Sequence, residues 1–266
     1  SKKNITRSTT RLMFSYGLGD AGTGLVATQF GFFLFKFFIS AGLPVIIAGS
    51  LLMLIKIWDA VNDPLIGWLS DRTKSRWGPR IPWMVAASVP LGFSLAAIWW
   101  TPTGSVLTKT IYYAIISIIV MTAYTSINLP FAALSTEISE KTAIRTRLNA
   151  SRFTGSIIAG LTGLIIAGVV LGSEGSANNE YFLMGKISGC IAVAATLISC
   201  WGLAPFAKKA RRPSGKVEAI TLQFKRIFRN KKFLKVITLY ILLWCALQLM
   251  QTVALIYVEY VLNVPT

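Results

Sequence analysis

The sequence predicts an all-α integral membrane protein. Apolar residues make up 54% of its 266 residues and charged residues only 14%. The apolar residues also form runs long enough to cross a bilayer as helices, which takes about 20 residues each. A net charge of +17 would suit nucleic-acid binding, but the basic residues lie between the apolar runs and not on one folded face. We therefore expect a lipid bilayer, and no nucleic acid, as the partner of this chain.

Seven membrane-spanning helices are expected in order along the chain. Each is an apolar run that polar or basic connections bound on either side. The first run is no cleavable signal peptide, because it is too long and further spans follow it. The expected helices cover residues 14–39, 44–70, 81–101, 110–134, 151–172, 182–203 and 234–262.

Basic residues mark alternate connections between these spans. They occur in the amino-terminal tail, which ends at Arg11, and in residues 72–80, 141–147 and 204–232. The last of these segments alone holds ten Lys and Arg. The opposite connections carry almost nothing positive beyond Lys109. By the positive-inside rule, we expect a cytoplasmic amino terminus and insertion in the plasma (inner) membrane.

Three regions follow from this pattern. Residues 1–203 form a six-helix transmembrane bundle, residues 204–232 a basic cytoplasmic linker, and residues 233–266 one further helix. We interpret the linker as a solvated connection that also touches anionic lipid headgroups.

Two carboxylates in the second span are the most informative residues of the chain. An ionisable side chain at the centre of a membrane helix costs about 2.5–3.5 kcal/mol to insert, so such residues usually mark a path for ions or protons. Asp59 and Asp63 are four residues apart and therefore lie on one helical face, and Asn62 can add a carbonyl oxygen. These oxygen ligands suit sodium, whereas crowding of the two carboxylates suits a proton. A third interpretation is a structural ion pair between Asp59 and Lys56.

The motifs of common enzyme classes are missing from the sequence. It contains no histidine, which removes the usual zinc ligand and general base. No phosphate-binding glycine loop and no nucleophile elbow lies where a loop could present it. We therefore expect no enzyme, no ATP-driven pump, and no cofactor other than a coupling cation.

Four segments resemble one transporter family. Residues 56–83, which begin Lys-Ile-Trp-Asp-Ala-Val-Asn-Asp-Pro, resemble the second helix and following loop of the glycoside-pentoside-hexuronide:cation symporters. This is the melibiose permease family, within the major facilitator superfamily. Residues 16–20, 124–131 and 145–152 resemble its first, fourth and fifth helices. The resemblance implies a major facilitator-type bundle with about seven of twelve expected helices present. The chain would then be the amino-terminal half plus the first helix of the carboxy-terminal half, and the remaining five helices would be absent.

The resemblance also implies functional residues. The family's cation ligands match Asp59, Asn62, Asp63 and Thr125. Its substrate-binding positions match Tyr124, Arg152 and Asn128, the last in place of a carboxylate, and Gly24 stands where melibiose permease has another. We expect Asp20, one turn earlier, to replace that carboxylate, and Tyr16, Tyr124 and Phe131 to face the apolar sides of a sugar. The residues implied for a gating loop are Asp71, Arg72, Arg76 and Arg80.

Alternatives remain for individual features. Arg152 could instead snorkel to the membrane interface. In the fifth span, small residues recur every fourth position from Gly155 to Ala167, which predicts close helix packing. The glycines of the first span, Gly17 to Gly24, would permit bending beside the site.

Together these features predict a secondary active symporter that couples entry of sodium or protons to uptake of a sugar or glycoside. Alternating access would move the substrate across the membrane. Two other functions remain open at this point: a lysolipid-type cation symporter of the same superfamily, and a truncated, non-transporting membrane subunit docked in a larger complex.

Overall fold

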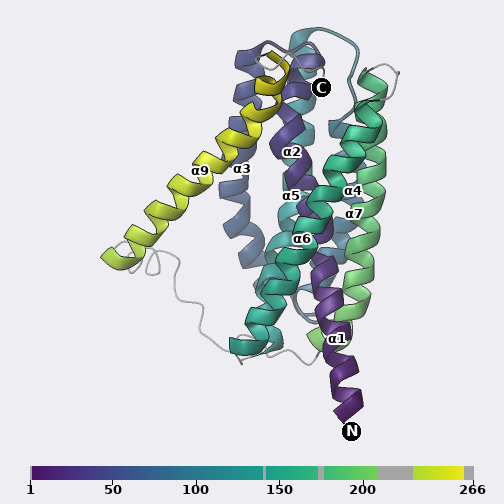
Figure 1. Cartoon of the computed structure of the whole chain (residues 1–266), viewed down its shortest axis with the longest axis vertical. Helices are drawn as coiled ribbons and strands as arrows, with labels where there is room; N and C mark the ends of the chain where they lie inside the picture. The colour runs from purple at the N-terminus through teal and green to yellow at the C-terminus, as the bar shows by residue number, and fades with distance from the viewer. Residues whose placement is uncertain (1, 140–141, 173–176, 209–229, 261–266) are drawn as a thin grey trace. The chain divides into compact units, whose positions relative to one another are not determined.

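Helices and short connections make up the whole described part of the protein. The computed structural model describes residues 2–139, 142–172, 177–208 and 230–260, and within these ranges it contains no strand (Figure 1). The chain divides into two compact units, Ser1–Ala210 and Arg211–Thr266. The all-helical prediction is therefore confirmed, while most of the expected basic linker, residues 209–229, lies outside the described residues.

Seven stretches in the described ranges are long and apolar enough to cross a membrane, as predicted. The first of them, Thr10–Ser40, is made by two consecutive helices that are interrupted at Asp20. The helices are α1 (Lys2–Gly19), α2 (Ala21–Ser40), α3 (Val45–Arg72), α4 (Ile81–Ile98), α5 (Val106–Ile138), α6 (Thr142–Leu171), α7 (Ala177–Ala207) and α9 (Lys231–Tyr260).

Several helices are longer than the sequence predicted. Helix α5, for example, covers Val106–Ile138 instead of residues 110–134. Its first turn is capped by Ser105, whose hydroxyl accepts a hydrogen bond from the backbone N–H of Thr108 at 3.3 Å. Apolar runs mark the hydrocarbon layer alone, whereas capped polar turns continue the helices beyond it.

The helices of the first unit run along its length, with α1 and α2 following one another end to end and α3–α7 beside them (Figure 1). Helix α4 packs against α5 and α7, α2 against α6, and α3 against α5. Helices α1 and α6 approach so closely that a Cβ atom at Gly155 would overlap the carbonyl oxygen of Gly17. The predicted small-residue packing of the fifth span is thus confirmed. Gly24 of the first span also faces α6, since a Cβ there would lie 2.5 Å from Ser156 Oγ, whereas Gly22 faces Ala192 of α7.

An aromatic cluster fixes the end of this unit that lies away from the amino terminus. Phe37 of α2 is fully buried, and its ring centroid lies 4.9 Å from that of Tyr181, 5.2 Å from Trp99 and 5.8 Å from Tyr113. Each such pair contributes about 0.5–1.5 kcal/mol beyond the area that it buries. The cluster joins α2, α5 and α7 to the end of α4.

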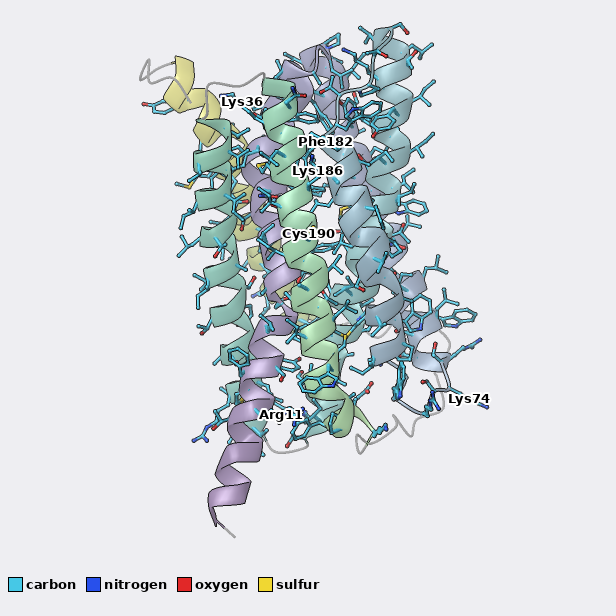
Figure 2. All side chains as sticks on the ribbon, turned by 90° about the vertical axis from the view of Figure 1, so that its right-hand side faces the viewer. Arg11, Lys36, Lys74, Phe182, Lys186 and Cys190 are labelled. Atoms are coloured by element: carbon cyan, nitrogen blue, oxygen red, sulfur yellow. The ribbon has the colours of Figure 1, made fainter. Side chains whose placement is uncertain are left out.

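Several exposed basic side chains of the first unit lie near its two ends, whereas Lys56 and Asp63 of α3 are exposed between them. Figure 2 shows Arg11 and Lys74 near one end and Lys36 near the other, with Phe182, Lys186 and Cys190 at successive levels of α7. The Lys186 ammonium lies 4.6 Å from the ring centroid of Phe182. Exposed apolar side chains cover the surface between the ends, as expected of a surface that faces lipid.

Helix α9 forms the described part of the second unit. It carries exposed apolar residues along its length, and Tyr240 stacks on Trp244 one turn later with ring centroids 6.0 Å apart. An apolar helix of this length suits a transmembrane span.

Candidate functional site

Helix α3 holds the two intramembrane carboxylates in different surroundings. Asp59 is half-buried toward α5, whereas Asp63, one turn later, is exposed. Lys56 is exposed, and among the described residues it forms no ion pair with Asp59. The interpretation of Asp59 as half of a structural ion pair with Lys56 is therefore wrong.

Helix α5 contacts both carboxylates through one side chain. The Thr125 hydroxyl donates a hydrogen bond to Asp59 Oδ1 at 3.3 Å, and it also interacts with the Asp63 carboxylate. The structure thus brings together three of the four residues that the resemblance implied for a cation.

Asn62 fixes the contact between α3 and α5. It is only 1% exposed, and its amide nitrogen donates to the backbone oxygen of Met121 at 3.4 Å. One turn earlier, Trp58 Nε1 donates to Thr122 Oγ1 at 3.0 Å. Because the Asn62 nitrogen is engaged, Oδ1 is the atom that its amide could offer to a cation.

A proline next to Asp63 leaves one backbone oxygen of α3 without its usual hydrogen bond. Pro64 lies inside α3 and has no N–H, so the carbonyl group of Ala60 has no hydrogen-bond donor four residues later. Carboxylate, hydroxyl, amide and carbonyl oxygens suit a hard cation. The residues present therefore fit sodium. Sequence analysis missed this carbonyl, although the Asp-Pro pair is its signal.

A second polar cluster forms where α1 meets α2. Asp20 separates the two helices, and its Oδ2 lies 3.1 Å from Arg152 Nε of α6 in an ion pair whose angle is not that of a hydrogen bond. Arg152 Nη2 lies 3.4 Å from Asp20 Oδ1 and donates to Asn128 Oδ1 at 2.9 Å. The Thr23 hydroxyl donates to Asp20 Oδ1 at 2.9 Å. Arg152 points into the protein and does not snorkel.

Tyr124 links the two clusters. It is partly buried on α5, next to Thr125 and one turn before Asn128. Its phenol is within electrostatic range of the charged groups of both clusters, namely Asp20, Arg152, Asp59 and Asp63. A ligand at Tyr124 would therefore be influenced by both.

Tyr16 and Phe131 pack beside the Arg152–Asp20 cluster and are not free to contact a ligand. Both are fully buried. Their rings stack with centroids 4.5 Å apart, and the Tyr16 hydroxyl donates to the Phe131 backbone oxygen at 3.0 Å. The Arg152 guanidinium lies 5.5 Å from the centroid of the Phe131 ring. The expectation that these two rings face a sugar is wrong, because helix packing covers them.

The residues implied for a gating loop separate into two groups. Arg80, which is 7% exposed, pairs with Asp71 Oδ1 at 2.5 Å and with Glu137 Oε1 at 2.7 Å. It also donates to Ser70 Oγ at 2.7 Å. By contrast, Arg72 and Arg76 are exposed and lie over tryptophan rings, the first 3.9 Å from the centroid of Trp68 and the second 5.5 Å from that of Trp77.

Sequence analysis missed Glu137. It assigned this acid to a connection, whereas the structure places it in the last turn of α5 with 6% exposure, paired with Arg80. The burial of Arg80, which needs more than one acceptor, is what points to Glu137, and the sequence did not show that burial.

Comparison with known proteins identifies the family. Residues 15–266 match the family described as MFS/sugar transport protein. The chain belongs to this major facilitator family, which confirms the resemblance.

Three relatives show the range of this family. Over 212 residues, 77% of this chain and 38% of the relative, the chain is 37% identical to "Uncharacterized symporter sll1374" of Synechocystis sp.. It is 33% identical over 168 residues, 63% of this chain and 36% of the relative, to "Putative glycoside/cation symporter YagG" of Escherichia coli. It is 28% identical over 161 residues, 60% of this chain and 31% of the relative, to "Sodium-dependent lysophosphatidylcholine symporter 1" of Xenopus tropicalis. The chain therefore spans less than half the length of these relatives.

Proposed function

We propose that this chain is the ion-binding part of a secondary symporter that takes up a sugar or glycoside together with sodium. The observation that carries the proposal is the position of Thr125. Its hydroxyl donates to Asp59 and also interacts with Asp63, and it lies three residues before Asn128, which accepts a hydrogen bond from Arg152 of the second cluster. Two polar clusters within one membrane bundle are costly, and a transported ion and its substrate explain both.

Sodium would bind among oxygens that this chain supplies. Asp59, Asp63, Asn62 Oδ1, Thr125 Oγ1 and the Ala60 carbonyl are the candidates. The bound cation would neutralise the two carboxylates and hold α3 against α5 at Thr125, so that Tyr124 and Asn128 are fixed for the substrate. A proton on the same carboxylate pair is the alternative, because like charges close together favour a shared proton.

The substrate would bind at Arg152, Asp20, Asn128 and Tyr124. Planar polar groups are suited to sugar hydroxyls, and the Tyr124 ring to an apolar face of the sugar. Alternating access would then need the two halves of a complete transporter. In the proposed topology, the basic end of the bundle, with Arg11, faces the cytoplasm.

The test is cation-dependent ligand binding by the purified protein in lipid nanodiscs. Glycoside affinity is measured in sodium chloride and in potassium chloride at equal ionic strength, over a range of pH. We expect sodium to raise glycoside affinity at least tenfold. An effect of pH without an effect of sodium would assign a proton instead, and glycoside binding that neither cation changes would overturn symport.

A lysolipid is the second candidate substrate, because relatives include a sodium-dependent lysophosphatidylcholine symporter. The exposed side chains Phe153, Ile157 and Leu161 on α6 begin next to Arg152 and would suit an acyl chain. Sodium-dependent binding of lysophosphatidylcholine that glycosides do not compete would favour this function.

A further inference from the structure

Arg152 has one carboxylate partner and one neutral partner. Its Nε and Nη2 groups contact Asp20, and Nη2 also donates to Asn128. The pair is largely buried, with 20% of the arginine side chain and 9% of the aspartate side chain exposed. The formal charge of this cluster is therefore zero.

A second carboxylate has no room at the neighbouring position. Gly24 lies one turn after Asp20, and a Cβ atom there would lie 2.5 Å from Ser156 Oγ and 2.9 Å from both the Cα and the carbonyl oxygen of Ser156. The backbone of α6 cannot give way as the tip of a side chain could. The close contact between α2 and α6 thus prevents a second carboxylate at position 24 from pairing with Arg152.

The remaining donors of Arg152 are available without breaking the pair. A guanidinium group has five N–H donors, and the contacts to the residues that the structure describes use Nε and Nη2. Both N–H groups of Nη1 are left for a ligand. A neutral hydroxyl can accept from Nη1 and donate to the oxygen of Asp20 or Asn128.

Two effects disfavour the binding of an anionic ligand. To pair with Arg152 it must compete with Asp20, and an Asp20 that loses its partner is a buried, uncompensated charge. It must also lie near Asp59, because Thr125, which donates to Asp59, lies on α5 only three residues before Asn128, which accepts from Arg152. Both effects disfavour a negative charge on the ligand.

We propose that the Arg152–Asp20 pair selects a neutral polyhydroxylated ring over the same ring carrying a carboxylate. Asp20 is the residue that determines this preference, since its carboxylate neutralises the charge of Arg152. The inference rests on the proposed function, because it names the class of glycoside that this site takes.

The experiment compares matched pairs of ligands that differ only at carbon 6. Methyl glucoside and methyl galactoside are each paired with their uronate counterparts. The two members of a pair compete for binding to the nanodisc-embedded protein in saturating sodium, which gives their relative affinities. We expect the neutral member to bind at least tenfold more tightly in every pair that binds. Equal or tighter binding of the uronate would overturn the inference.

Two substitutions should shift this ratio in opposite directions. Asp20→Asn releases the charge of Arg152, so the uronate should gain at least tenfold relative to the neutral ring. Asn128→Asp adds a carboxylate, so the preference for the neutral ring should rise at least fivefold. The second variant keeps the inference testable where the first does not fold. A purely structural role would lower both affinities together, and an unchanged ratio in a folded variant would contradict the proposal.

Failure of the proposed function gives a different result. In that case no member of either pair binds, while lysophosphatidylcholine binds in a sodium-dependent manner, and the charge preference falls with it. If neutral and acidic rings both bind with sodium dependence and equal affinity, symport of glycosides stands and the charge inference alone is rejected.

Discussion

The hydroxyl group of Thr125 on α5 donates a hydrogen bond to the carboxylate of Asp59 on α3 at 3.3 Å. This contact joins the two helices in the middle of the first unit, where Asn62 and Trp58 of α3 also bond to α5. Thr125 is buried, so its hydroxyl is part of the helix contact and a candidate cation ligand at the same time.

Thr125→Val should remove the hydroxyl with little change in shape. We expect sodium affinity to fall about tenfold, since one hydrogen bond or ligand contact to a charged group contributes about 1.5 kcal/mol. Sodium titration followed by tryptophan fluorescence measures the change. Thr154→Val is the matched control, because Thr154 is exposed on α6 and donates only to the Ala150 backbone oxygen. Equal losses in both variants would remove Thr125 from the cation site.

Asp63→Asn should abolish the stimulation of glycoside binding by sodium while the protein still folds. The amide keeps the shape of the side chain but lacks the charge that attracts the cation. Lys74→Gln is the control, as it removes an exposed charge just after the same helix and outside the cluster. Binding isotherms with and without sodium measure the effect, and normal stimulation in Asp63→Asn would disprove coupling at this pair.

Arg152→Ala should weaken glycoside binding and leave sodium affinity unchanged. It removes the donors that face the ligand, and it leaves Asp20 without its ionic partner. Because an unpaired buried charge costs about 3–5 kcal/mol, the Arg152→Ala/Asp20→Asn double variant should recover part of the lost thermal stability. Unchanged glycoside affinity in a folded Arg152→Ala protein would refute the assignment.

Gly155→Ala should destabilise the bundle by about 1–3 kcal/mol, the usual effect of overpacking. The new methyl group would overlap the Gly17 carbonyl oxygen. Gly168→Ala on the same helix is a strict control, because a Cβ atom there meets nothing within 4 Å, and alanine should stabilise by up to about 1 kcal/mol. Thermal unfolding in detergent compares the two, and similar melting temperatures would contradict the close approach of α1 and α6.

Arg80→Met should destabilise the protein by about 3–5 kcal/mol, because Glu137 is then buried without a partner. Arg80→Met/Glu137→Met should be more stable than the single variant. The exposed Arg76, which lies over Trp77, provides the control, and Arg76→Met should cost about 0.5–1 kcal/mol. Thermal unfolding of all three variants tests whether Arg80 and Glu137 depend on each other.

The sequence predicted the number and order of the membrane spans because hydrocarbon thickness leaves a direct mark on composition. It also singled out Asp59 and Asp63, since charges are conspicuous inside apolar runs, whereas Arg152 was identified through the family resemblance. It could not show that Tyr16 and Phe131 stack on each other, or that Gly24 packs closely against Ser156. Such contacts depend on which helices are neighbours, and periodicity along one helix carries no information about its partners.

The position of α5 between the two clusters has a consequence for ion leak, the movement of sodium without the sugar. Thr125 and Asn128 are three residues apart, about 4.5 Å along the helix axis, and they contact Asp59 and Arg152 respectively. Under the proposed coupling, the factor by which sodium strengthens glycoside binding equals the factor by which glycoside strengthens sodium binding. A carrier that holds sodium weakly without its sugar seldom moves the ion alone. The short separation on α5 would therefore limit how much of the ion gradient is dissipated without transport.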